Sequence, residues 1–154
     1  MSSASVYFDE SGEFLIIPFS ENEIGMWTAV NEPERMQWDG SSVAELGEKI
    51  LKSLVVSQNR VGPPIGQKPE VLLLASGAKS GTAFAKTRQL VTIDTDGDQG
   101  KLMVYFLHRN ANYAWEGRID DPPEWTVALP LDASADAVGG AVIQVLRAAN
   151  VAGV

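Results

Sequence analysis

The sequence predicts an α/β protein of the α+β type, with an antiparallel β-sheet and helices packed on it. Runs of β-forming residues around short polar turns indicate two hairpins, over residues 6–19 and 90–107. Apolar residues at helical spacing indicate a helix after each hairpin, beginning near residues 42 and 132. Because the same order occurs twice, we expect two similar hairpin–loop–helix halves.

The first hairpin is expected to have strands at residues 6–8 and 14–17, joined by a polar turn at residues 9–12. Four consecutive apolar residues in the second strand indicate burial on both faces, and Pro18 is expected to end it. A third strand is predicted at residues 26–30, which include Trp27. A loop at 31–34 follows, and residues 37–40 lead into the helix.

Ser42 and Glu45 have the spacing of a capping box, which predicts the start of the first helix. Its apolar face is given by Val43, Leu46, Ile50, Leu51 and Leu54. Residues 59–69 contain three prolines and two glycines, so a surface loop is expected there.

Residues 75–93 lie between the two halves and follow an apolar run at residues 71–74. Gly77 is a natural place for the chain to reverse, because glycine tolerates positive φ. Ser80 is a candidate N-cap for a short helical turn at residues 82–86. Phe84, its one large apolar side chain, is expected to hold that turn against the core.

The second half is predicted to have strands at residues 90–93 and 102–107 around a turn at 94–100. Trp115 is expected on or near another strand, and residues 120–124 form an acidic loop. Residues 125–131 form a strand that Pro130 places at an edge or an end. The closing helix covers residues 132–149, capped by Ser134 or Asp132. Its apolar face is given by Val138, Val142, Val145 and Leu146.

The two predicted helices can be aligned without a gap. Ser42, Gly47, Ile50 and Leu54 match Ser134, Gly139, Val142 and Leu146 at identical spacing. The strands align similarly, residues 6–9 with 91–94 and residues 12–17 with 100–105. Coincidence is the alternative, because a hairpin followed by a helix is a common order.

The composition is that of one globular domain spanning residues 1–154, with 45% hydrophobic and 21% charged residues. The absence of cysteine excludes a disulfide scaffold and thiolate metal sites. No basic, apolar leader is present, and the apolar runs are too short to span a bilayer, so we expect a cytoplasmic protein without membrane contact.

The net charge is −8, from 20 acidic and 12 basic residues. Residues 1–40 carry −7, residues 41–88 carry +4 and residues 89–154 carry −5. Direct binding of nucleic acid is not expected from so acidic a chain. The acidic residues either keep the surface solvated or form a face that binds a basic partner.

No catalytic or metal site is predicted, and no cofactor is expected. His108 is the only histidine, so paired imidazoles are excluded, and no nucleophile motif accompanies it. The acidic run at residues 94–100 lacks the glycine and glutamate that an EF-hand requires at positions 6 and 12. Residues 77–80 lack the glycine spacing of a phosphate-binding loop.

Three acidic groups are the candidate binding residues. One is Asp94, Asp96 and Asp98 in the second hairpin turn, and another is Asp120, Asp121 and Glu124 beside Trp125. The third is Glu32 and Glu34, between Trp27 and Trp38. Acids beside an aromatic anchor have the composition of an interface hot spot, and the alternative is solvated loops with tryptophans mostly in the core.

The stretch Ser-Gly-Ala-Lys-Ser-x-x-Ala-Phe-x-Lys at residues 76–86, which runs into the strand at 90–93, resembles contact-dependent growth inhibition immunity proteins. The likeness extends to the helix ending at residues 57–60 and to the final amphipathic helix. The resemblance implies a non-enzymatic cytoplasmic protein that binds the CdiA C-terminal toxin domain of a neighbouring cell, in a 1:1 complex, and occludes its active site.

Many such toxins act on nucleic acid, so the resemblance implies a nuclease with a basic cleft as the partner. A small α/β enzyme or ligand-binding domain with a pocket near His108 is the alternative, and a structural subunit of a larger assembly is a third. Replacing His108 with alanine separates the first two, because an immunity protein should still protect cells.

Overall fold

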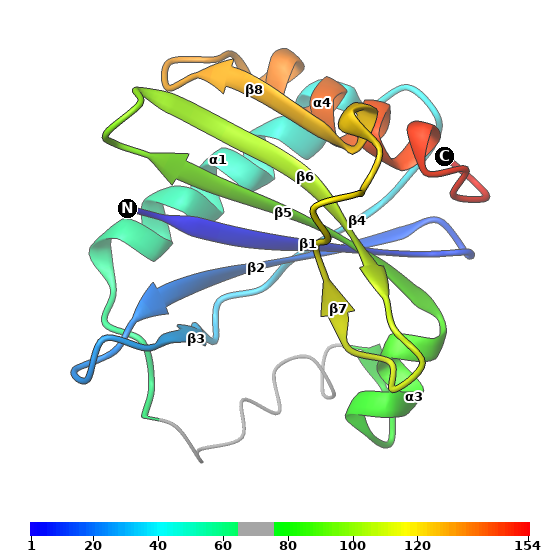
Figure 1. The fold of residues 1–154 in the computed structure, drawn as a ribbon, viewed down its shortest axis with the longest axis horizontal. Helices are drawn as coiled ribbons and strands as arrows, with labels where there is room; N and C mark the ends of the chain where they lie inside the picture. The colour runs from blue at the N-terminus through cyan, green and yellow to red at the C-terminus, as the bar shows by residue number, and fades with distance from the viewer. Residues whose placement is uncertain (65–75) are drawn as a thin grey trace.

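The computed structural model describes residues 1–64 and 76–154 (Figure 1). In this part of the chain, eight strands form one antiparallel sheet, and two long helices cover one of its faces, which confirms the predicted α+β class. The strands are β1 (Ser3–Asp9), β2 (Glu13–Glu21), β3 (Trp27–Ala29), β4 (Glu34–Gln37), β5 (Arg88–Asp96), β6 (Lys101–Arg109), β7 (Trp115–Glu116) and β8 (Thr126–Pro130). The helices are α1 (Val43–Asn59), α3 (Gly81–Lys86) and α4 (Ala135–Ala148), with a 3-10 turn η1 (Pro123–Trp125).

The strand order is β3-β2-β1-β5-β6-β7, with β4 also paired to β2 and β8 also paired to β6. The two predicted hairpins, β1–β2 and β5–β6, meet where β1 pairs with β5, and Val6 lies opposite Val91 at that junction. Each hairpin is followed by short edge strands and then by a long helix. The topology therefore repeats the hairpin–loop–helix unit on the two sides of the β1–β5 pair.

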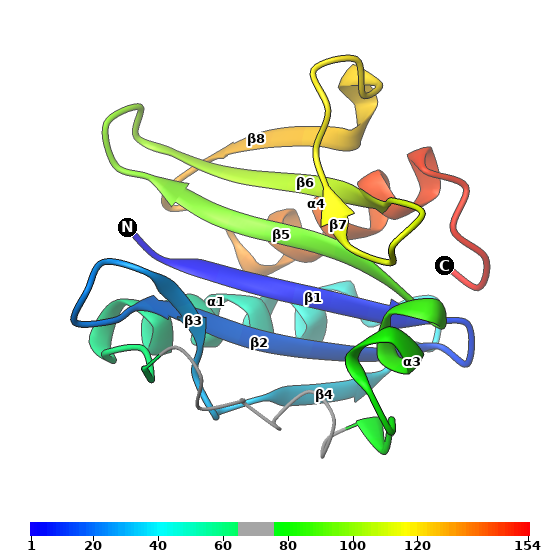
Figure 2. The ribbon, with the colours of Figure 1, turned by 60° about the horizontal axis from the view of Figure 1, so that its bottom comes forward.

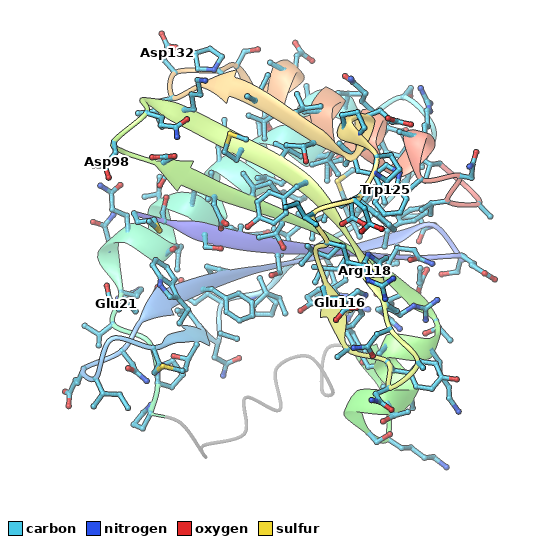
Figure 3. The ribbon with its side chains drawn as sticks, viewed as in Figure 1. Glu21, Asp98, Glu116, Arg118, Trp125 and Asp132 are labelled. Atoms are coloured by element: carbon cyan, nitrogen blue, oxygen red, sulfur yellow. The ribbon has the colours of Figure 1, made fainter. Side chains whose placement is uncertain are left out.

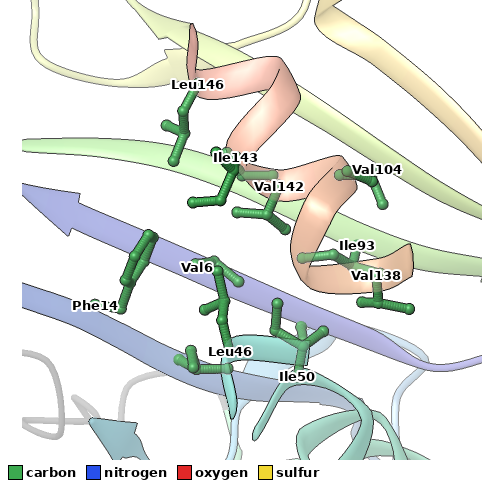
Figure 4. Close-up of a cluster of buried hydrophobic side chains, with 14 of the residues drawn as sticks. Val6, Phe14, Leu46, Ile50, Ile93, Val104, Val138, Val142, Ile143 and Leu146 are labelled. Carbon is green, nitrogen blue, oxygen red and sulfur yellow. The ribbon is translucent and has the colours of Figure 1, made fainter. Parts of the chain in front are cut away.

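The main core lies between the sheet and the helices α1 and α4 (Figure 4). Alternate residues of β1 and β2, such as Val6 and Phe14, point into it, as their two-residue period requires. The helices contribute the apolar faces that the spacing predicted, and their buried members are Leu46, Ile50, Leu54, Val138, Val142, Val145 and Leu146. Ser134 caps α4 as expected, accepting a hydrogen bond from the backbone of Ala137 at 3.2 Å.

A second cluster lies on the opposite face of the sheet, under α3. Phe84 is buried there, with its ring 4.9 Å from the Tyr7 ring, centre to centre. The predicted anchoring of this turn by Phe84 is confirmed, as are the Ser80 cap at 3.1 Å from Ala83 N and the positive φ of Gly77. The apolar run predicted at residues 71–74, and residues 65–69 of the predicted loop, lie outside the described residues.

The residues predicted to be covered on both faces, 14–17, are all buried. The expectation that Pro18 ends this strand is wrong, because β2 continues to Glu21. Beyond residue 16, β2 exchanges its neighbour β4 for β3, which begins to pair at Phe19. Pro18 lies at this change of neighbour, where its missing N–H breaks no ladder, and its carbonyl oxygen accepts a hydrogen bond from Val30 N at 2.8 Å.

The start of α1 differs from the predicted capping box. The Ser42 hydroxyl donates to Asp39 Oδ2 at 2.6 Å and does not cap the helix. Asp39 Oδ1 accepts the backbone N–H groups of Ser41 and Ser42, both at 2.8 Å. The Ser42 hydroxyl and these backbone groups lower the pKa of Asp39. The carboxylate three residues upstream therefore organises the turn that leads into α1.

Several boundaries also differ from expectation. Glu34, predicted in a loop, begins β4, and β5 extends through Asp96 into the predicted turn. The strand predicted to begin at Trp125 is β8, which begins one residue later. Of the strands within residues 1–64 and 76–154 it pairs only with β6, so Pro130 lies on an edge strand as expected. Among the described residues, no helix has the length and apolar character needed to cross a membrane.

Candidate functional site

A groove of about 410 Å³ runs across the sheet on the face opposite α1 and α4. Trp27 of β3 and Trp115 of β7 both line it, from the two sides of the central strands. Its remaining lining residues are Met1, Ser3, Ser5, Tyr7, Phe19, Leu90, Thr92, Asp94, Tyr105 and Leu107. An apolar concave surface with a few polar groups is a common form of binding site.

Asp94 is the charged residue of this groove. The sequence placed it in a turn, but it lies within β5 and accepts a hydrogen bond from Ser3 Oγ at 2.5 Å. The Tyr105 hydroxyl donates to its other oxygen. Burial, and then this hydrogen bond, raises the pKa of Tyr105 well above its ordinary value. The Asp94 carboxylate is therefore held in place by side chains from β1 and β6.

Asp96 and Asp98 lie beyond Asp94, at the end of the β5–β6 hairpin. Asp96 Oδ1 accepts the backbone N–H groups of Asp98 and Gln99 at 3.1 Å, as expected for an aspartate in a tight turn. The ends of β2 and β8 lie at the same end of the sheet, so Glu21 and Asp132 are found there too (Figure 3). We call Glu21, Asp96, Asp98 and Asp132 the acidic end.

Glu32 and Glu34 lie beside α1, near the edge of the sheet that is formed by β4. Glu34 forms ion pairs with Lys49, at 3.5 Å, and with Lys52, and Glu32 forms one with Arg60 at 3.0 Å. The hydrogen bond from Lys52 is the main cause of a lowered pKa at Glu34. The basic middle segment of the sequence thus neutralises this predicted group within the chain.

Asp120, Asp121 and Glu124 lie in the segment between β7 and β8. Asp120 and Glu124 are exposed, whereas Asp121 turns inward, and its Oδ1 lies 3.3 Å from His108 Nδ1. Asp121 Oδ2 also accepts the backbone N–H of Arg118 at 2.7 Å. The three predicted acidic groups therefore occupy three separate places on the molecule.

His108 lies on β6 with 19% of its side chain exposed, as expected for a partly buried histidine. Its Nε2 faces Glu116 Oε1 at 3.5 Å, so both ring nitrogens lie beside carboxylates. In a catalytic triad, one ring nitrogen of the histidine faces a carboxylate and the other faces a serine hydroxyl. Here Glu116 lies beside the nitrogen that the serine would need. The ring also lies 6.3 Å from the Trp125 ring, and this arrangement joins β6, β7 and η1.

The described residues contain no group of three or more histidine, cysteine, aspartate or glutamate side chains that could hold a metal ion. Neither the groove nor the role of Tyr105 was predicted from the sequence. The available signal was the alternation of residues 3–7, in which Ser3, Ser5 and Tyr7 share one face. That pattern shows which side chains share a face of the sheet, but it does not show the groove, whose walls include Trp27 of β3 and Trp115 of β7.

No family model matches the chain, and no curated protein matches it. Among solved structures, it is similar to a protein of unknown function from Neisseria meningitidis, with a TM-score of 0.69, 18% identity, and coverage of 96% of this chain and 94% of that chain. It is similar also to a chain of the CdiA-CT/CdiI toxin and immunity complex from Yersinia pseudotuberculosis. That TM-score is 0.69, the identity is 14% and 95% of each chain is covered. These similarities show a shared fold over nearly the whole chain.

Proposed function

We propose that this protein is an immunity protein, which binds a cognate CdiA C-terminal toxin domain and neutralises it by occluding its active site. The similarity in fold to a chain of a toxin and immunity complex, over 95% of both chains, carries this proposal. The likeness of residues 76–86 to contact-dependent growth inhibition immunity proteins supports it independently. Residues 1–154 act as one domain in a 1:1 cytoplasmic complex.

The distribution of charge supports a basic partner, such as a nuclease with a cationic cleft. The net charge is −8, and Glu32 and Glu34 are neutralised by bases of α1 and the residue after it. Asp96, Asp98, Asp120 and Glu124 have no basic partner among the described residues. Their unbalanced charge attracts a basic surface and speeds the encounter with it.

The eight predicted acids contribute unequally to this interface. We propose that Asp94, Asp96 and Asp98, beside the groove, meet the toxin together with the exposed acids Asp120 and Glu124. Asp121, Glu32 and Glu34 act mainly within the chain: Asp121 faces His108, and the two glutamates face bases of α1 and the residue after it. No step of the proposed function requires proton transfer or covalent chemistry by this protein.

A rescue experiment tests the proposal. Cells that express the toxin domain encoded beside this chain should survive when the chain is co-expressed, and the two proteins should purify as one complex. The His108→Ala variant should still protect. Death of the cells despite ample folded protein would contradict the immunity function.

The second candidate is a small enzyme or ligand-binding domain that uses His108. The carboxylates at 3.3 and 3.5 Å from its two nitrogens are the observation that favours it. This candidate requires the His108→Ala variant to lose function, so the same rescue experiment separates the two.

A further inference from the structure

An exposed apolar patch surrounds the turn between β2 and β3. Ile24 is 74% exposed and Val61, in the segment after α1, is 68% exposed, although both are aliphatic. Met26 and Trp27 are also exposed large hydrophobic residues. We call Ile24, Met26, Trp27 and Val61 the turn patch. Ile24 and Val61 line the same pocket, of about 280 Å³, so the patch is hollowed between them.

The turn is fixed by Asn22, which is buried at its base. Asn22 Oδ1 accepts the backbone N–H groups of Ile24 at 3.1 Å and Met26 at 3.0 Å. Its own backbone N–H donates to the Met26 carbonyl at 2.8 Å, and Gly25 closes the turn with a φ of +81°. The exposed side chains therefore project from a backbone that is already ordered.

The other wall of the pocket is fixed as well. Gly62 N donates to the Glu21 carbonyl at 3.0 Å, and Thr28 Oγ1 donates to the Pro63 carbonyl at 2.8 Å. A side chain at residue 62 would place its Cβ 2.2 Å from the Ser20 carbonyl oxygen, so only glycine permits this close approach. Ordered walls lower the entropy cost of binding.

The charge and polarity around the patch indicate what could bind it. Glu21 and Glu23 flank the turn, and neither has a basic partner within residues 1–64 and 76–154. The Asn22 Nδ2 donor also lacks a hydrogen-bond partner in that part of the chain. Through Glu21 the patch is continuous with the acidic end. An apolar centre with an acidic rim is complementary to an apolar side chain among basic ones.

On the basis of the proposed immunity function, we propose that the turn patch is the apolar centre of the toxin interface. It receives a toxin segment that places an aliphatic or aromatic side chain between Ile24 and Val61. Lysine or arginine residues on the same segment meet Glu21 and Glu23. Truncation of a few central residues removes much of the binding energy in such interfaces.

The test uses the full chain and the toxin domain encoded beside it, with association and dissociation rates measured separately. The double variant Ile24→Ala, Val61→Ala should dissociate at least about tenfold faster than the wild type. Glu21→Gln with Glu23→Gln should slow association a few-fold at low salt, and this effect should disappear at high salt. The matched control is Val55→Ala, because Val55 is exposed on α1, which covers the sheet on the side of the main core. The association and dissociation rates of this control should stay within about twofold of wild type.

Because Ile24 and Val61 are exposed, the variants should unfold at the wild-type temperature, which separates lost binding from lost folding. Wild-type dissociation rates in the Ile24 and Val61 variant would overturn the assignment of the patch while leaving the immunity function intact. If the free wild-type chain forms a dimer and this variant is a monomer, the patch serves self-association. That result would also overturn the assignment of the patch to the toxin interface. A wild-type chain that does not bind the toxin would overturn both proposals.

Discussion

Gly47 of α1 and Gly139 of α4 make reciprocal contacts where the two helices cross. A Cβ added at Gly47 would lie 1.7 Å from the carbonyl oxygen of Ala135, the first residue of α4. A Cβ added at Gly139 would lie 2.1 Å from the carbonyl oxygen of Val43, the first residue of α1. Each glycine thus admits the first turn of the other helix, as expected if the two halves are related by a local two-fold axis.

The Gly139→Ala variant should lose about 3 kcal/mol of unfolding free energy, because the methyl group forces the helices apart. Gly140→Ala is the matched control. Its Cβ would meet only Val43 Cγ1, at 3.9 Å, which is an ordinary contact. Since alanine is the better helix former, this control should be neutral or gain up to about 1 kcal/mol. Urea denaturation of both variants measures the difference, and equal stabilities would contradict the close helix contact.

Arg88 and Asp9 form an ion pair where β1 ends and β5 begins, with side chains only 9% and 16% exposed. Arg88 also lies over the Phe84 ring, 4.6 Å from its centre. The Arg88→Met variant should lose about 1–3 kcal/mol of unfolding free energy at pH 7, because it leaves Asp9 charged and partly buried. Arg35→Met, which removes an exposed pair with Glu13, should lose less than about 1 kcal/mol.

The same pair predicts a dependence of stability on pH. Burial raises the pKa of Asp9, but hydrogen bonds from Ser11 and Glu13 and the charge of Arg88 outweigh it and lower the pKa overall. The stabilisation by ionised Asp9 is therefore complete above its unfolded pKa of about 3.9, and it is lost as the pH falls through the folded value. The Asp9→Asn variant should lose less stability than the wild type between pH 5 and pH 2. Thermal unfolding at several pH values measures this difference. If the wild type and the variant lost equal stability as the pH fell, Asp9 would not contribute to the pH dependence.

Asp96→Asn with Asp98→Asn should slow association with the toxin domain at low salt, with little change in dissociation. Exposed charges at the acidic end act on the encounter more than on the final complex. Glu32→Gln with Glu34→Gln is the comparison, because these acids are paired with Arg60, Lys49 and Lys52. It should lower thermal stability slightly and leave the association rate unchanged. An association rate that is indifferent to ionic strength would contradict electrostatic steering.

Phe84→Ala should release α3 from the sheet, because Phe84 is the large apolar side chain by which this short helix is anchored. The expected loss of unfolding free energy is about 3–5 kcal/mol. Tyr7 would lose its edge-on contact with Phe84, and since burial raises the pKa of Tyr7 to about 12, its titration should move toward the ordinary value of about 10. An unchanged tyrosine titration would indicate that another group covers Tyr7.

The sequence alone was enough to predict the fold class, both hairpins, the long helices with their buried faces, and the alignment of Gly47 with Gly139. These features depend on the two-residue period of strands, the 3.6-residue period of helices and the conformational freedom of glycine, all of which are local. The acidic character was also plain from the sequence. The sequence could not reveal that Glu32 and Glu34 would be neutralised by bases 15–28 residues away, because an ion pair depends on where the two residues lie in space.

The positions of the groove, the His108 contacts and the turn patch became known only from the three-dimensional structure. The groove combines residues from strands that are distant in the chain, as when Ser3 and Tyr105 both reach Asp94, and the turn patch combines the β2–β3 turn with Val61 after α1. The turn that Asp39 organises before α1 and the continuation of β2 through Pro18 also differed from the expectation. In both cases the outcome depended on which neighbour supplied or needed a hydrogen bond, and local propensity does not contain that information.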